Sequence, residues 1–145
     1  MKKSFPANLS ILILFLLYSV STLAQERTSF NIHRNIDLKN ESQTKEVKIE
    51  MNEKECRFNL RINSMVRGGE VTIEIYNPKG KKQGNFSVGC EIQSDHSQET
   101  VNGQISKLIE NPELGDWKIK IIPKNAVGKV AIDFSQDLVI KTSNK

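Results

Sequence analysis

From Phe30 onward, apolar and polar residues alternate along the chain in a series of short segments. Between Cys56 and Ile62, every second residue is apolar and the residues between them are Arg or Asn. Successive side chains of a strand point to opposite faces, so this alternation predicts strands with one buried and one wet face. Eight or nine segments show it: Phe30–Leu38, Val47–Met51, Cys56–Ile62, Val71–Tyr76, Phe86–Ile92, Val101–Ile109, Trp117–Ile121, Val130–Phe134 and the shorter Leu138–Ile140.

Turn-forming residues separate these segments. Asn77-Pro78-Lys79-Gly80 has the residue order that a type I turn prefers, and Arg67-Gly68-Gly69 supplies glycines that accept positive φ. Residues 111–115 and 125–128 divide later pairs of segments, and no stretch keeps a helical period. Alternating strands with one wet face indicate antiparallel pairing, and two such sheets bury their apolar faces against each other. The predicted fold is all-β, an antiparallel, jelly-roll-like β-sandwich of eight or nine short strands.

The N-terminal residues predict export. Lys2 and Lys3 precede an apolar run from Leu9 to Val20, which ends in the small residues Ser21-Thr22-Leu23-Ala24. These are the three parts of a secretory signal peptide, with cleavage expected after Ala24. A retained membrane anchor is the alternative, but a spanning helix needs roughly 20 apolar residues and polar residues crowd both ends of this run. We therefore expect a signal peptide at residues 1–24 and one domain at residues 25–145, located in the periplasm, at the cell surface or outside a bacterial cell.

Charge and composition exclude little beyond a nucleic-acid role. The formal net charge of the 145 residues is +4, and Lys2 and Lys3 leave with the signal peptide. Positive and negative residues are interleaved along the rest of the sequence, which is typical of a solvated surface. We expect neither nucleic acid nor a membrane as the partner of residues 25–145.

Two cysteines, Cys56 and Cys90, both fall on the apolar phase of their segments. An exported protein meets an oxidising environment, in which a disulfide between them would persist and stabilise the fold by roughly 3–4 kcal/mol. Two buried free thiols are the alternative.

Two regions resemble a known family. One is Gly69 to Gly80, with a strand that runs into an Asn-Pro turn; the other is Asn111 to Ile119, continuing through Gly128 to Ile132. This order is similar to the jelly-roll modules of secreted bacterial proteases, the pre-peptidase C-terminal and proprotein-convertase P-type domains. The resemblance covers about half of residues 25–145 and implies an accessory domain without chemistry of its own. The sequence departs from the family in lacking a protease domain and the aspartate-rich loops that bind calcium in some members.

The most distinctive polar face is formed by the residues that point outward from the segment beginning at Cys56. Two guanidinium groups interleaved with two amides suit carboxylates, phosphates or a partner's backbone, and a solvated face is the alternative. Tyr76, beside Asn77 at a strand end, is the one aromatic residue predicted to point outward, so it is the candidate for stacking on a sugar. The predicted binding residues are Arg57, Asn59, Arg61, Asn63, Tyr76 and Asn77.

Catalytic and metal motifs are not found in the sequence. The two histidines, His33 and His96, lie in no nucleophile motif such as Gly-x-Ser-x-Gly. Asp95, His96 and Glu99 match neither zinc nor calcium spacing and fit a polar loop. We expect no enzyme activity, metal or cofactor, and predict an exported module that binds a protein or an envelope component. A carbohydrate-binding module is the alternative, and an unrecognised enzyme would require a concave polar pocket that contains His33 or His96.

Overall fold

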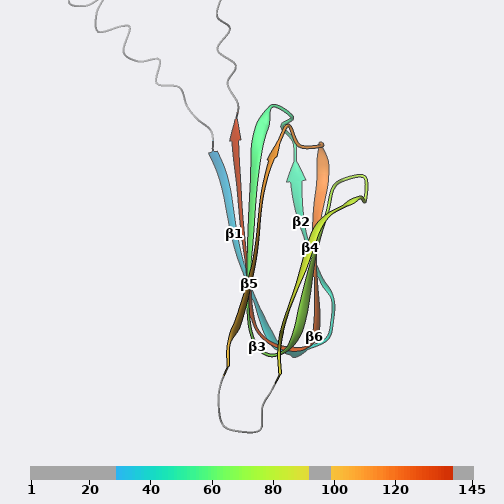
Figure 1. Cartoon of the computed structure of the whole chain (residues 1–145). Coiled ribbons are helices and arrows are strands. Elements are labelled where there is room, and N and C mark those ends of the chain that lie inside the picture. The colour runs from blue at the N-terminus through green and yellow to red at the C-terminus, as the bar shows by residue number, and fades with distance from the viewer. Residues whose placement is uncertain (1–28, 92–98, 139–145) are drawn as a thin grey trace, which may run out of the picture.

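The computed structural model describes residues 29–91 and 99–138 and shows an all-β fold in that part of the protein (Figure 1). All pairings between strands are antiparallel, within one six-stranded sheet. The strands are β1 (Ser29–Glu41), β2 (Lys45–Met51), β3 (Cys56–Tyr76), β4 (Lys82–Cys90), β5 (Val101–Glu110) and β6 (Gly115–Leu138). The predicted all-β class and antiparallel pairing are confirmed.

The two long strands, β3 and β6, form the centre of the sheet and pair with each other from Cys56–Leu138 to Tyr76–Lys118. On the outer side of β6, β1 pairs with its C-terminal half and β2 with its N-terminal half. On the outer side of β3, β5 pairs with its N-terminal half and β4 with its C-terminal half. The sheet therefore has two halves that share β3 and β6, one completed by β1 and β5, the other by β2 and β4.

These two halves face each other, because the long strands bend back on themselves (Figure 1). Phe58 pairs with Gln136 near the end of β6, whereas Trp117 lies near its start. In a straight strand Gln136 and Trp117 would be about 60 Å apart. The rings of Phe58 and Trp117 are nevertheless in edge-to-face contact, with centroids 5.0 Å apart. Only a folded sheet brings them together.

The bend explains why the predicted number of strands is wrong. Arg67-Gly68-Gly69 and residues 125–128 were expected to be turns between separate strands, but both lie inside continuous strands, β3 and β6. Pairing shifts register on either side of Gly68 yet continues beyond it. Gly69 has a φ of 72° and Asn125 a φ of 50°, which lets both strands change direction without ending. Six strands thus hold the predicted segments, except that β4 ends at Cys90 and β6 at Leu138, while residues 92 and 139–140 lie outside the described residues.

The core lies between the two halves and follows the predicted alternation. Along β3 and β6, inward side chains such as Ile62, Ile73 and Ile119 are fully buried, and Trp117 is only 3% exposed. The remaining buried apolar residues include Leu38, Val47, Ile49, Met51, Phe58, Leu60, Val66, Val71, Ile75, Val88, Ile121, Val130, Ile132 and Phe134. Four aromatic residues lie on the apolar phase of their predicted segments: Phe58, Trp117 and Phe134 are buried, whereas Phe86 is half-buried and packs against the core.

The predicted bridge between Cys56 and Cys90 is absent from the structure, in which both cysteines are buried and free. Cys56 begins β3, whereas Cys90 pairs with Gly69 at the bend. The stretch of β3 between Cys56 and Gly69 is about 43 Å long, and a disulfide needs Cα atoms within about 7 Å. The alternation correctly predicted that both side chains are buried, but it carried no information on their separation.

We expect two free thiols per molecule, neither of which reacts with a thiol reagent before unfolding. Burial raises the pKa of the Cys56 thiol, which lowers the fraction of reactive thiolate at neutral pH. Titration with a chromogenic disulfide reagent, without reductant, checks this in native buffer and in denaturant. If the denatured protein gave no free thiol and had a mass lower by two hydrogens, Cys56 and Cys90 would be shown to form a disulfide.

The described residues, 29–91 and 99–138, include no helix with the length and apolar character that crossing a membrane requires.

Candidate functional site

Polar side chains from three neighbouring strands meet on the outer face of the half completed by β1 and β5. The pairing of β1, β6 and β3 aligns His33 with Asp133 and Arg61, and the next row aligns Asn31 with Ser135 and Asn59. These two rows enclose a groove of about 310 Å³, which we call the polar groove. It is lined by Asn31, Ile32, His33, Asn59, Arg61, Asp133, Phe134 and Ser135.

A series of hydrogen bonds holds one wall of the groove. His33 Nδ1 lies 2.5 Å from Asp133 Oδ1, and the side-chain amide of Asn35 lies 2.8 Å from His33 Nε2. The neutral tautomer that satisfies both contacts donates from Nδ1 to the carboxylate and accepts at Nε2 from the amide. Both ring nitrogens then have partners within the protein. A general base needs a free nitrogen facing the substrate or a nucleophile, and His33 does not offer one in this arrangement.

The two arginines of the predicted binding row differ in their partners. Both are exposed on the outer face of β3, as the alternation predicted, with Asn59 half-buried between them and Asn63 half-buried beyond Arg61. Arg57 Nε lies 3.5 Å from Glu110 Oε1 on β5. Among residues 29–91 and 99–138, no carboxylate lies within ion-pair distance of Arg61. Arg61 thus lines the groove with a guanidinium group whose charge is not balanced by a direct partner there.

Tyr76 lies on the outer face of the other half of the sheet, away from the polar groove. Its hydroxyl donates a hydrogen bond of 2.7 Å to Glu74, which also forms an ion pair with Lys82. The ammonium groups of Lys82 and Lys120 lie 5.7 Å and 5.2 Å from the centre of the tyrosine ring. The Lys82 contact lowers the pKa of Glu74, and the bond to Glu74 raises the pKa of Tyr76. Cations therefore occupy the ring face that a sugar would need.

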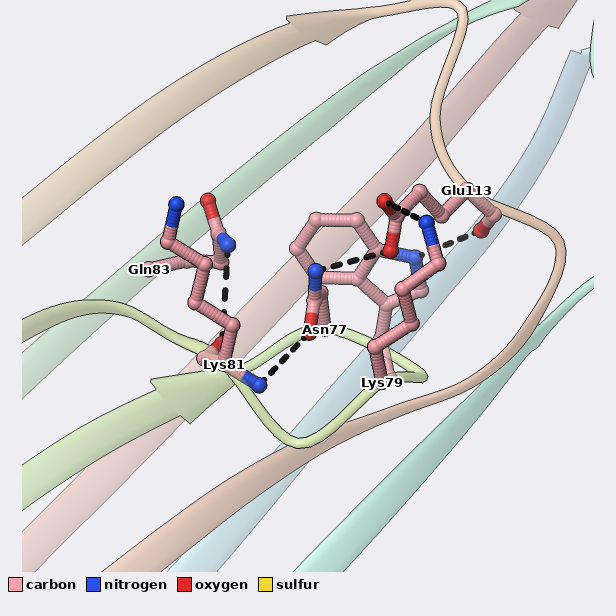
Figure 2. A network of polar contacts seen from close by, with 6 residues as sticks. Asn77, Lys79, Lys81, Gln83 and Glu113 are labelled. Carbon is pink, nitrogen blue, oxygen red and sulfur yellow. Dashed lines mark hydrogen bonds and ion pairs between the residues drawn. The ribbon is translucent and has the colours of Figure 1, made fainter.

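Asn77, another of the predicted binding residues, lies in the turn between β3 and β4. It is 6% exposed, and its side-chain oxygen accepts a hydrogen bond from the Lys81 backbone amide at 2.7 Å. Its amide nitrogen donates to Glu113 Oε2 at 2.7 Å, while Lys79 donates to the other carboxylate oxygen at 2.8 Å (Figure 2). Both polar atoms of the Asn77 side chain are therefore hydrogen-bonded. The bond to Glu113 links the turn before β4 to the segment before β6.

The predicted binding residues therefore separate into two groups. Arg57, Asn59, Arg61 and Asn63 share one outer face, whereas Tyr76 lies on the other half of the sheet and Asn77 in the turn that follows it. The sequence reasoning missed Asn31, Asp133 and Ser135, which complete the groove, and it considered His33 only as a catalytic base. The alternation does place Asp133 on the outward phase of its segment, but nothing in the sequence says that this strand lies between β1 and β3.

In the part of the protein that the structure describes, no cluster of three or more His, Cys, Asp or Glu side chains could hold a metal ion. His96 and Asp95, which the sequence raised as candidate ligands, lie outside the described residues.

The described residues thus form a single folded antiparallel sheet with a polar groove on one outer face. No family model and no curated protein matches this sequence. Among solved structures, it is similar to a protein described in the words "Bacillus endospore appendages form a novel family of disulfide-linked pili". The TM-score is 0.41 at 11% identity, over 80% of this protein and 92% of that one.

Proposed function

We propose that this protein is an exported, non-catalytic β-sandwich module that binds a protein or a component of the cell envelope through the polar groove. The sandwich is formed by one sheet folded in two, and the contact between Phe58 and Trp117 across the core supports it. Export rests on the predicted signal peptide at residues 1–24. The jelly-roll resemblance, with its accessory role, agrees with this proposal but does not name a partner.

The observation that carries the proposal is the exposed, unbalanced guanidinium of Arg61 in a groove lined by amides and a hydroxyl. An arginine offers five hydrogen-bond donors in a planar fork, which suits recognition of an acceptor on a partner. The groove is a polar pocket that contains His33, as the enzyme alternative requires, but the engagement of both imidazole nitrogens of His33 within the protein supports a binding role over catalysis.

A protein partner is favoured over a neutral glycan. Sugar-binding sites usually combine polar groups with an exposed aromatic ring on which a pyranose stacks. The aromatic residue that lines the groove, Phe134, is only 2% exposed, and Tyr76 is on the other outer face with cations over its ring. The groove can donate and accept hydrogen bonds but gives a sugar no stacking surface.

Site-specific photo-crosslinking in the producing cell tests this proposal. A crosslinker at Asn59 should trap a partner, whereas the same crosslinker at Thr72, on the outer face of the other half, should trap little. The adduct at position 59 should fall several-fold when Arg61→Gln is added. An excess of the same protein without a crosslinker should compete it away. Equal adducts at both positions, or an adduct at 59 that ignores Arg61→Gln, would contradict binding through the groove.

A further inference from the structure

The polar groove contains a guanidinium, Arg61, and a carboxylate, Asp133, and of the two only Asp133 is bound to a side chain within the described part of the protein. Asp133 lies directly across from Arg61 on the neighbouring strand, but its carboxylate is bound to His33 at 2.5 Å rather than to the guanidinium. Arg57, four residues along β3, is paired with Glu110. A negatively charged ligand is therefore stabilised most beside Arg61, where it displaces no existing ion pair.

The surroundings of Arg61 select among anions. A guanidinium fork matches the two coplanar oxygens of a carboxylate, with two parallel hydrogen bonds. The Asp133 carboxylate on the next strand repels any anionic ligand, and it repels a phosphate dianion more strongly than a carboxylate with a single charge. Asn31, Asn59 and Ser135, in the neighbouring row, offer amides and a hydroxyl to the uncharged atoms beside that carboxylate.

We propose that the polar groove recognises a carboxylate of a protein partner, either an Asp or Glu side group or the free carboxylate at a polypeptide's end, with Arg61 as its direct contact. The groove's volume of about 310 Å³ is at the small end of the range for ligand sites, which suits one acidic residue better than an extended polymer. The lack of an exposed aromatic ring in the lining favours a peptide carboxylate over that of an acidic sugar. This inference rests on the proposed function and specifies its ligand.

Titration of the isotopically labelled protein with N-acetyl-L-glutamate, followed by NMR, tests the inference. We expect saturable shifts of the Arg61 Nε–H and of the side-chain amides of Asn59 and Asn31. N-acetyl-L-glutamine α-amide, in which both carboxylates are replaced by amides, should show no saturable shifts. N-acetyl-L-glutamine keeps only the terminal carboxylate, so its affinity shows whether that group or the side-chain carboxylate is bound. Arg61→Gln should weaken binding of N-acetyl-L-glutamate by about tenfold or more, because it removes a charge-assisted hydrogen bond. Arg57→Gln is the matched control and should leave binding unchanged, since Arg57 does not line the groove.

Two further probes separate the alternatives. Inorganic phosphate that binds as tightly as N-acetyl-L-glutamate would show a general anion site and overturn selection of a carboxylate. Glucuronate that binds as tightly or more tightly would assign the groove to an acidic sugar and overturn the protein partner. If no probe binds but crosslinking at Asn59 still depends on Arg61, the carboxylate assignment fails while the proposed function stands. If a crosslinker at Asn59 trapped no partner in the protein with Arg61 intact, the proposed function itself would fail.

Discussion

Replacing Gly69 with alanine is expected to destabilise the protein by about 3 kcal/mol or more, since both strain and a clash arise at the bend. Gly69 has a φ of 72°, which residues other than glycine adopt at a cost. A Cβ atom there would lie 2.2 Å from the backbone oxygen of Asn125 and 2.5 Å from that of Lys124. These atoms belong to β6, which is paired with β3 on both sides of the bend, so they cannot retreat without breaking the pairing.

Urea unfolding followed by the fluorescence of Trp117, the single tryptophan, measures this effect. Gly80→Ala is the matched control: its φ is 78°, but a Cβ atom there would meet nothing within 4 Å. We expect the control to cost about 1 kcal/mol, from backbone strain alone. If the two variants lost the same stability, close approach of the strands at the bend would not be what requires glycine at position 69.

Truncating Phe58 to alanine is expected to cost about 3–5 kcal/mol, the range found for large aromatic side chains removed from a core. Phe58 is completely buried, and its ring contacts those of Trp117 and Phe134 edge to face, each at a centroid distance of 5.0 Å. Trp117 belongs to the other half of the folded sheet. The variant therefore removes a contact that holds the halves together as well as apolar burial.

Phe30→Ala is the control for the same truncation at the edge of the core. Phe30 is 54% exposed and meets Phe134 at 6.2 Å, so we expect its loss to cost about 1 kcal/mol. The near-ultraviolet circular dichroism of Trp117 should weaken in Phe58→Ala and stay unchanged in Phe30→Ala. Equal unfolding free energies for the two variants would mean that the halves do not pack through Phe58.

The candidate site was only partly predictable from the sequence. The outward orientation of Arg57, Asn59, Arg61 and Asn63 follows from alternation within one segment, which is a local property of the backbone. Whether each arginine has an acidic partner depends on residues far along the sequence. Arg57 pairs with Glu110 of β5, whereas Arg61 lies across from Asp133 of β6 without an ion pair to any described residue. The residue order around Asn77 identifies a turn but does not reveal Glu113 as the partner of its side chain.

By itself, the sequence determined the all-β class, the antiparallel pairing and the buried phase of most segments, because these depend on the two-residue period of a strand. The tertiary structure alone decided that two of the expected turns are bends within β3 and β6 and that Cys56 lies far from Cys90. It also decided that His33, Asp133 and Arg61 share one row. The physical reason is that a glycine pair permits either a turn or a bend. Hydrogen bonds to distant strands, which no local pattern encodes, select between the two.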